Sequence, residues 1–156
     1  GAPPDAFSET GQDWGLPPYD WAAVAARGYE PFRERGRHAA ALFDLVRVDH
    51  VVGLYRTYHR PLDGAPAFFV PADEAAQRAQ GEAVLEALRQ DGTALVAEDL
   101  GVIPDFVRAS LDALGIPGFR VLRWEERDGR FRPPAEWPVL SIGTNLTHDT
   151  ETTAVS

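Results

Sequence analysis

The sequence predicts an α/β fold built on a parallel sheet, and three observations support that prediction. Short apolar runs alternate along the chain with longer segments of helical periodicity, as expected of successive βα units. The apolar runs are nearly continuous, which is typical of strands covered on both faces. The chain has 156 residues, well short of the about 250 that a closed (β/α)8 barrel needs. We therefore expect part of a (β/α)8, or TIM, barrel.

The first predicted elements after the opening loop are a helix and a strand. Residues 1–20 are rich in Pro and Gly and are interpreted as a loop. Apolar residues at roughly helical spacing predict a helix over residues 31–43, and the short apolar run at residues 45–48 predicts a buried strand. Residues 53–71 follow neither period, so we expect them to be irregular.

The rest of the chain repeats the alternation of helix and strand. Predicted helices lie at residues 72–89 and 104–114, and predicted strands at 94–97, 119–122 and 139–142. An open doubly wound sheet is the alternative to a barrel. None of the predicted strands is followed by the Gly-rich phosphate loop that marks the nucleotide-binding form of that sheet.

Composition excludes several classes of function. The formal net charge of −9 and the pI near 4.8 argue against a nucleic-acid or membrane-surface partner. The absence of Cys excludes disulfides, thiolate chemistry and Cys-bound zinc. No apolar run approaches the length of about 18 residues that a membrane span requires. The chain lacks Met and its first residues resemble neither a signal peptide nor a natural start, so we interpret it as a fragment.

Three carboxylates stand at the ends of predicted strands. Asp49 and Glu98 each follow directly on a strand, and Asp149 lies beyond the last one. In a βα barrel the C-terminal ends of the strands form the catalytic face. Neighbouring strands run about 4.8 Å apart, so the two carboxyl groups could come within about 5–5.5 Å, the spacing of a retaining glycosidase. Helix N-capping, a common role of Asp, is the alternative explanation.

Arg47 stands two residues before Asp49 and therefore on the same face of the strand, where its guanidinium can pair with the carboxylate. The same cation argues against a competing interpretation, a divalent-metal enzyme, because it would repel a bound metal ion. In that interpretation oxygen and imidazole ligands would come from Asp49, His50, Asp99, His148 and Asp149.

Several aromatic side chains could serve as platforms for sugars, whose apolar C–H faces stack on aromatic rings. Trp14 and Tyr19 lie in the opening loop, and Trp124 lies just past the third predicted strand. Trp21 begins an apolar helical stretch, which favours a place in the core. Packing within a loop or core is the alternative for each of these residues.

In their order along the chain, these motifs resemble the amylomaltases, family 77 of the glycoside hydrolases and relatives of the α-amylases. The resemblance spans nearly the whole chain and is carried by residues 1–5, 7–8, 11–12, 14–15, 17, 19–21, 47–50, 97–101, 116–118 and 147–149. It implies barrel strands four to seven with flanking helices. Residues 1–21 would form a substrate-binding loop region and residues 22–156 the βα units.

The resemblance also implies an activity and a set of residue roles. The activity is 4-α-glucanotransfer: α-1,4-glucan segments move between maltooligosaccharides by a retaining double displacement, without a cofactor or metal, in the cytoplasm. Asp49 matches the nucleophile, Glu98 the general acid/base, and Asp149 a third acid that grips sugar hydroxyls. The implied substrate-binding residues are Arg47, His50, His148, Asp5, Trp14, Tyr19 and Trp124.

Two segments depart from the family pattern. Residues 150–156 differ from the usual continuation of the Thr-His-Asp motif, and residues 59–71 are shorter and richer in Pro and Ala than the usual sugar-contacting segment. Two other functions stay open at this point. An α-amylase-type hydrolase shares the chemistry up to deglycosylation, and a non-catalytic glucan-binding remnant would need no chemistry at all. The exposed edges of a partial barrel lead us to expect self-association.

Overall fold

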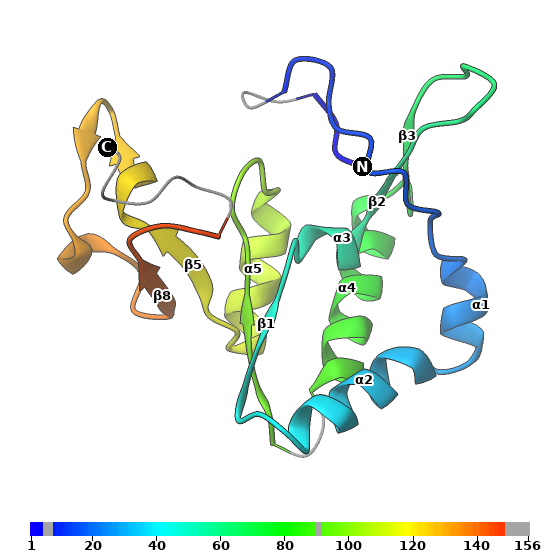
Figure 1. The fold of residues 1–156 in the computed structure, drawn as a ribbon, viewed down its shortest axis with the longest axis horizontal. Helices are drawn as coiled ribbons and strands as arrows, with labels where there is room; N and C mark the ends of the chain where they lie inside the picture. Colours follow the sequence, from blue (N-terminus) through cyan, green and yellow to red (C-terminus); the bar gives the residue numbers. More distant parts are fainter. Residues whose placement is uncertain (5–7, 90–91, 149–156) are drawn as a thin grey trace.

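A four-stranded parallel sheet lies at the centre of the computed structural model, which describes residues 1–4, 8–89 and 92–148 (Figure 1). The strands pair in the order β1-β4-β5-β8, which is also their order along the chain. They are β1 (Leu45–Val48), β4 (Ala94–Ala97), β5 (Gly118–Val121) and β8 (Ser141–Thr144). Because the order shows no reversal, the doubly wound alternative is wrong and the predicted partial barrel is confirmed.

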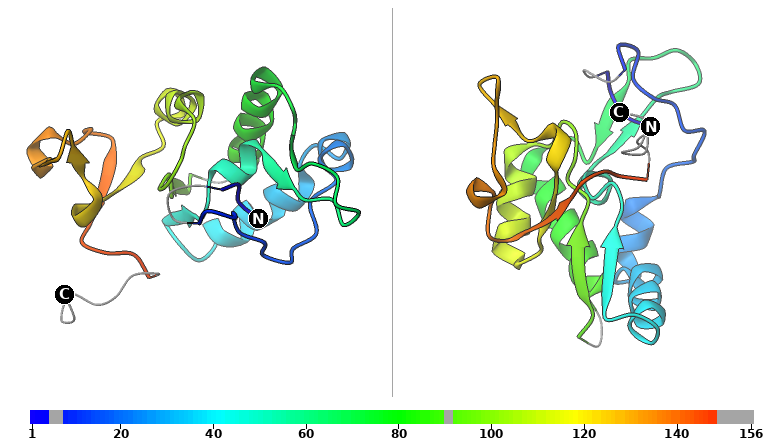
Figure 2. Two further views of the ribbon diagram at one scale, coloured as in Figure 1. Left: turned by 90° about the horizontal axis from the view of Figure 1, so that it is seen from above. Right: turned by 60° about the vertical axis from the view of Figure 1, so that its left-hand side comes forward.

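Helices connect β1 to β4 and β4 to β5, and they lie on one side of the sheet. Helix α2 (Glu30–Ala40) precedes β1, α4 (Glu74–Leu88) leads into β4, and α5 (Asp105–Leu114) leads into β5. The front view and the view from above place α4 and α5 side by side, on one side of β1 and β4 (Figure 1, Figure 2). In the described part of the chain, no helix combines the length and apolar character needed to cross a membrane.

The helix ends explain why these segments start and stop where they do. The side chain of Asp73 caps α4 by accepting a hydrogen bond from the N–H of Ala76 at 2.8 Å. Helix α5 is capped at its C-terminal end by Gly115, which adopts the left-handed conformation with φ 66°. The helix therefore stops at Leu114, the predicted last residue.

The hydrophobic core lies between the sheet and the helices. Leu95 and Ala97 of β4 belong to one buried cluster with Val107 and Leu111 of α5. A second cluster joins Trp21 to Phe32, Val84 and Ala87. Trp21 is only 6% exposed, so this tryptophan is a core residue, as its place in an apolar stretch favoured.

Two regions contain more structure than predicted. Residues 53–71 overlap helix α3 (Val52–Tyr55) and an antiparallel hairpin of β2 (Thr57–His59) with β3 (Phe68–Val70). Strands of three residues are too short to show a period of two in the sequence. The helix α1 (Trp21–Ala26) precedes α2, and the polar loop after β5 contains η1 (Leu122–Trp124), β6 (Glu126–Arg127), β7 (Arg130–Phe131) and η2 (Pro134–Glu136).

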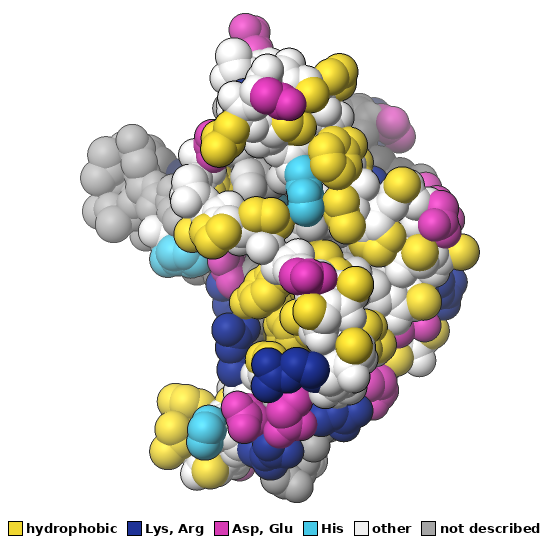
Figure 3. All heavy atoms as spheres, turned by 90° about the vertical axis from the view of Figure 1, so that its right-hand side faces the viewer, with side chains coloured by type: hydrophobic (Ala, Val, Ile, Leu, Met, Phe, Trp, Pro, Cys, Tyr) yellow, Lys and Arg dark blue, Asp and Glu magenta, His cyan; other side chains and the backbone are white. Residues whose placement is uncertain are grey.

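The surface shown in Figure 3 mixes charges of both signs. On this face arginine and acidic side chains are interleaved, most visibly toward its lower part, where α2 lies. The ion pair between Arg37 and Glu30 of α2, with a nitrogen–oxygen distance of 2.8 Å, is one example. The charges on this face therefore do not form one continuous basic surface.

Candidate active site

Asp49 and Glu98 stand at the same level, at the C-terminal ends of adjacent strands. The β1–β4 ladder ends with the pair Val48 and Ala97, so the two acids are the next residues on their strands. Backbone pairing continues past the ladder. The N–H of Glu98 donates to the carbonyl of Val48 at 2.9 Å, and the carbonyl of Glu98 accepts from the N–H of Val51 at 3.1 Å. The two acids are therefore neighbours, whereas the distance between their carboxyl groups stays a prediction.

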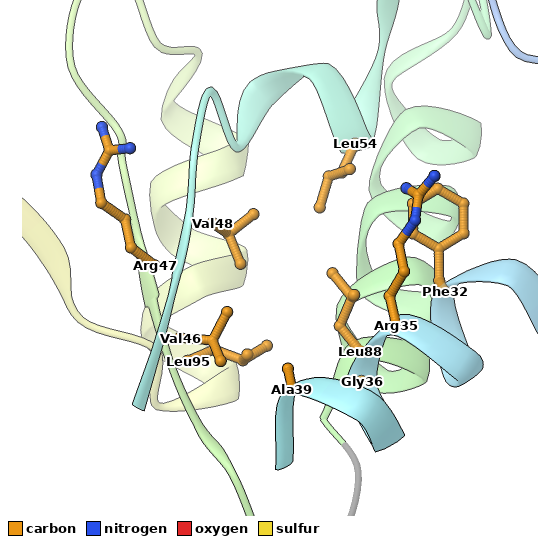
Figure 4. A pocket seen from close by; sticks show the side chains of 10 residues that line it. All are labelled: Phe32, Arg35, Gly36, Ala39, Val46, Arg47, Val48, Leu54, Leu88 and Leu95. Atoms are coloured by element: carbon orange, nitrogen blue, oxygen red, sulfur yellow. The ribbon is translucent and has the colours of Figure 1, made fainter. Parts of the chain in front are cut away.

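Arg47 and Asp49 lie on the face of β1 that points away from the helices. Figure 4 shows Val46 and Val48 pointing toward Leu88 of α4, with Arg47 pointing the other way. The period of two in a strand puts Asp49 on the side of Arg47. Arg47 Nη1 donates to Asp49 Oδ1 at 2.5 Å, the contact that the spacing of the two residues predicted. The Asp49 side chain is 68% exposed, so the carboxylate is open to an incoming ligand.

The Glu98 carboxylate is held at both oxygens by backbone N–H groups. Oε2 accepts from the N–H of His50 at 2.8 Å, and Oε1 accepts from the N–H of Leu100 at 2.7 Å. His50 has φ 45°, a left-handed conformation that few residues other than glycine adopt. This local turn brings the segment after β1 over Glu98. The two bonds fix the orientation of the carboxylate.

Neither acid caps a helix. Helix α3, which follows Asp49, has Val51 at its N-cap and no side-chain cap. Helix α5, which follows Glu98, has Pro104 at its N-cap and likewise no side-chain cap. The capping explanation is therefore wrong for both acids, and their positions call for another reason.

The ring of His50 contacts the opening loop. It meets Trp14 edge to face, with ring centroids 4.9 Å apart and an angle of 82° between the planes. Trp14 donates through Nε1 to Gln12 Oε1 at 2.8 Å. Burial lowers the pKa of His50, although the carboxylates of Glu98 and Asp49 act in the opposite direction. The ring is therefore mainly neutral at pH 7 and can both donate and accept hydrogen bonds.

A pocket of about 210 Å³ opens beside His50 and Trp14. The guanidinium of Arg56 lies over the ring of Phe69 in this region, 4.0 Å from its centroid. Further lining residues come from the opening loop, helix α3, strand β2 and the loop after β4: residues 1–4, Gln12, Val52, Tyr58 and residues 100–103. A mixture of aromatic, amide and cationic groups around one hollow suits a polyhydroxylated ligand.

Tyr19 lies among the side chains of α1 and α2. Its ring packs against Trp21 and Phe32, with centroid distances of 5.1 and 5.6 Å, and its hydroxyl accepts from Arg35 at 3.1 Å. The residues that line the pocket beside His50 do not include Tyr19. Its predicted contact with substrate stays a prediction.

The remaining predicted residues come from other parts of the chain. Trp124 belongs to η1, directly after β5, and is 45% exposed. His148 is exposed and is the last residue that the structure describes. Asp5 and Asp149 lie outside the described residues.

The role of Asp99 was missed by the sequence analysis. Its side chain is 3% exposed and pairs with Arg120 at 3.2 Å and with Arg108 at 3.6 Å. Its Oδ1 also accepts from the N–H of Phe119 at 2.7 Å. Consecutive strand residues point to opposite faces, so an acid that follows Glu98 had to point toward the helices. That alternation was the available signal.

The same arrangement weakens the metal-enzyme interpretation. Asp99, one of the ligands in that interpretation, forms ion pairs with Arg108 and Arg120 on the helix side of the sheet. Its carboxylate therefore lies on the opposite face from Asp49. Within the described ranges, no three His, Cys, Asp or Glu side chains come together in a group that could hold a metal ion.

A second hollow, of about 270 Å³, lies between β1 and the helices α2 and α4 (Figure 4). Its lining is almost entirely apolar: Phe32, Ala39, Val46, Val48, Leu54, Leu88 and Leu95, with Arg35, Gly36 and Arg47 beside them. β1, which borders the hollow, is the first strand of the sheet. The hollow offers apolar surface, and its lining residues include no acid.

Comparison with known proteins assigns nearly the whole chain to one family. The family model of glycoside hydrolase family 77, described as 4-alpha-glucanotransferase, matches residues 1–155. The 4-alpha-glucanotransferase of Chlamydia caviae is 38% identical over 159 residues, covering 99% of this chain and 30% of its own length. The 4-alpha-glucanotransferase of Mycobacterium tuberculosis is 39% identical over 163 residues, covering 99% of this chain and 22% of its own length.

Two solved structures share the fold. The crystal structure of amylomaltase from Corynebacterium glutamicum matches with a TM-score of 0.82 and 32% identity, covering 99% of this chain and 22% of that one. The amylomaltase from Streptococcus agalactiae in complex with acarbose matches with a TM-score of 0.75 and 25% identity, covering 96% and 30%. This chain thus spans less than a third of the length of these relatives. The family match extends over nearly the whole chain, and the chain belongs to glycoside hydrolase family 77, the 4-alpha-glucanotransferases.

Proposed function

We propose that this chain carries the acid-bearing part of a barrel that transfers α-1,4-glucan segments between maltooligosaccharides. The observation that carries the proposal is the pair of Asp49 and Glu98, on adjacent parallel strands, at one level and at the C-terminal edge. Membership of the family supports the choice of reaction. The related amylomaltase solved in complex with acarbose supports an oligosaccharide as the ligand.

The reaction is a retaining double displacement with two carboxylates in different roles. Asp49 attacks the anomeric carbon of the donor while Glu98 gives a proton to the leaving glucan oxygen, which forms a glycosyl ester on Asp49. Glu98, now ionised, takes the proton from a hydroxyl of the acceptor glucan. That oxygen attacks the same carbon, breaks the ester and restores Asp49.

The two acids stand in different environments. Asp49 is exposed and paired with Arg47, so it is an accessible anion. Glu98 is held at both oxygens by the N–H groups of His50 and Leu100, so its carboxyl group is oriented before a substrate arrives. Transfer of a proton to one particular glycosidic oxygen needs such a fixed direction.

The other predicted residues would form the subsites. In this proposal Trp14 offers an aromatic face and the neutral His50 ring offers a hydrogen bond beside the cleavage point. Asp149 and His148 bind sugar hydroxyls from the end of the last strand, and Asp5, Tyr19 and Trp124 extend the binding surface. Residues 1–21 act as the substrate-binding loop region and residues 22–156 as the βα units. The cytoplasmic location implied by the family resemblance is part of the same proposal.

The test compares products of the complete protein and of single variants. With maltotriose, a ladder of longer maltodextrins plus glucose on thin-layer chromatography indicates transfer, whereas maltose and glucose alone indicate hydrolysis. Asp49→Ala is expected to abolish both transfer and hydrolysis. Asp44→Ala is the matched control, because Asp44 is an exposed acid at the opposite end of the same strand, and it should keep activity.

Assigning the two roles requires a donor with a good leaving group. With α-maltosyl fluoride, Glu98→Gln should accumulate a covalent glycosyl intermediate detectable by mass spectrometry, because fluoride departs without a proton. Deglycosylation is then slow for lack of a base. An intermediate that accumulates in Asp49→Ala and not in Glu98→Gln would reverse the assignment.

A further inference from the structure

Arg47 is supported on two sides. One side is its ion pair with Asp49, and the other is the ring of Phe119, whose centroid lies 5.3 Å from Arg47 Cζ. Phe119 belongs to β5, so this contact reaches across β4 to β1. An arginine over an aromatic face gains a cation–π attraction and loses some of the freedom of its long side chain.

The register of the strands explains why Phe119 meets Arg47. Ala97 of β4 pairs with Gly118 of β5, so Glu98 and Phe119 are the next residues at one level. Side chains at one level in a parallel sheet point to the same face. Phe119 therefore stands on the face that carries Glu98, Arg47 and Asp49.

The backbone of Phe119 is held by contacts on both sides of its strand. Its N–H donates to Asp99 Oδ1 at 2.7 Å, and that carboxylate is buried against Arg120. On its other side Phe119 pairs with Ile142 of β8. The backbone of Phe119 is therefore held from both sides, which fixes the position from which its ring reaches Arg47.

We propose that Phe119 is a positioning residue for the transfer reaction: its ring holds the guanidinium of Arg47 at the place where it pairs with Asp49. The inference rests on the proposed function, because it concerns the step in which Asp49 attacks the donor. Phe119 acts through Arg47 and needs no contact with the sugar. Loss of the ring face leaves Arg47 free to take other rotamers, so a smaller fraction of molecules holds Asp49 ready to attack.

The test measures the first half-reaction in the complete protein. In a Glu98→Gln background with α-maltosyl fluoride, the rate at which the intermediate forms reports attack by Asp49 without interference from deglycosylation. Phe119→Leu keeps an apolar side chain but removes the ring face, and it should slow this rate about three- to tenfold. Phe119→Tyr keeps the face and should stay within about twofold of the parent.

A double-mutant cycle separates positioning from simple packing. In an Arg47→Gln background there is no guanidinium to hold, so adding Phe119→Leu should change the rate by less than about twofold. Three results would overturn the inference: an unchanged rate in Phe119→Leu, an equal loss in Phe119→Leu and Phe119→Tyr, or the same loss with and without Arg47. If Arg47→Gln is too slow to measure, the comparison of Leu with Tyr decides alone.

The same experiment distinguishes failure of the inference from failure of the proposed function. If the intermediate forms in Glu98→Gln and depends on Asp49, but Phe119→Leu behaves like the parent, only the inference about Phe119 is wrong. If Glu98→Gln forms no intermediate while the parent protein transfers glucan, the assignment of Asp49 and Glu98 is wrong, and the inference falls with it.

Discussion

Replacing Gly118 with Ala adds one methyl group at the position of a buried carboxylate. A Cβ atom on residue 118 would lie 2.5 Å from Asp99 Oδ1 and 2.7 Å from both Cγ and Oδ2. Asp99 cannot move aside cheaply, because its side chain is bonded to Phe119 and Arg120. Gly118 lies within strand β5. At a position with compatible backbone, Gly→Ala ordinarily stabilises by about 0.4–1 kcal/mol, so steric contact decides the sign here.

The expected loss follows from two effects. Overpacking of a filled site costs about 1–3 kcal/mol. Displacing one partner of a buried ion pair costs about 3–5 kcal/mol, and the lower end applies because Arg120 keeps Glu125 as a second partner at 3.8 Å. Arg108, at 3.6 Å and 44% exposed, adds little. These effects overlap, since the clash is relieved by the displacement, so we expect a net loss of about 3–4 kcal/mol.

Thermal unfolding of the complete protein, followed by circular dichroism, measures this loss. For a cooperative unit of about 150–250 residues, 1 kcal/mol shifts Tm by about 2–4 °C, so Gly118→Ala should lower Tm by roughly 6–16 °C. Gly143→Ala is a control in strand β8, where the added Cβ would meet ring carbons of the half-buried Trp137, the nearest at 2.8 Å. Gly143→Ala should lower the stability by less than Gly118→Ala, because it displaces no ion pair.

A double variant tests the cause. Asp99→Ala removes the carboxylate with which the new methyl group collides, so Gly118→Ala should cost little more in that background. The reasoning is refuted if Gly118→Ala melts within about 2 °C of the parent. It is also refuted if the fall in Tm of the double variant equals the sum of the falls in the two single variants.

Two further predictions concern the behaviour of the isolated chain and the stability of the protein at low pH. The isolated 156-residue chain should not convert maltotriose and should self-associate in sedimentation experiments, because β1 and β8 stand at the outer edges of the described sheet and an apolar hollow adjoins β1. Turnover by the isolated chain that disappears in Asp49→Ala would contradict this. Burial lowers the pKa of His50, so the unfolded protein takes up that proton first, and stability should be lost as the pH falls below about 6.5. His50→Asn, which tolerates a left-handed backbone, should show a smaller fall in Tm between pH 7.5 and pH 5; an equal fall in parent and variant would contradict this prediction.

The elements that the sequence predicted best are those with a strong local signal. Strands β1 and β4 have the predicted bounds, because in each an apolar run is bordered on both sides by polar residues or glycine. Strand β5 begins one residue before its predicted start, and β8 begins two residues after, because pairing with the neighbouring strand decides where a ladder begins. The hairpin of β2 with β3 was missed, since its three-residue strands depend on each other and not on their own pattern.

The contacts of the site also divide into those that the sequence predicted and those that it could not. The positions of Asp49 and Glu98 beside each other follow from their places at strand ends, and the contact of Arg47 with Asp49 follows from a spacing of two. The bond from the N–H of His50 to Glu98 could not be predicted, because it depends on a left-handed turn at a residue that is not glycine. The contact of Trp14 with His50 joins segments far apart in the chain, which no local pattern specifies.

The contact between Phe119 and Arg47 depends on register, and register is the property that local sequence determines least. A slip of one residue between β4 and β5 would turn Arg120 to the face of Glu98 and bury Phe119 against the helices. The β4–β5 ladder supplies a single register pair, Ala97 with Gly118, so backbone pairing alone specifies it weakly. Asp99 adds the missing specificity, because its carboxylate binds the N–H of Phe119 and the guanidinium of Arg120 on the side away from the acids. In this arrangement a buried ion pair serves to set register, and the register places an aromatic ring under Arg47.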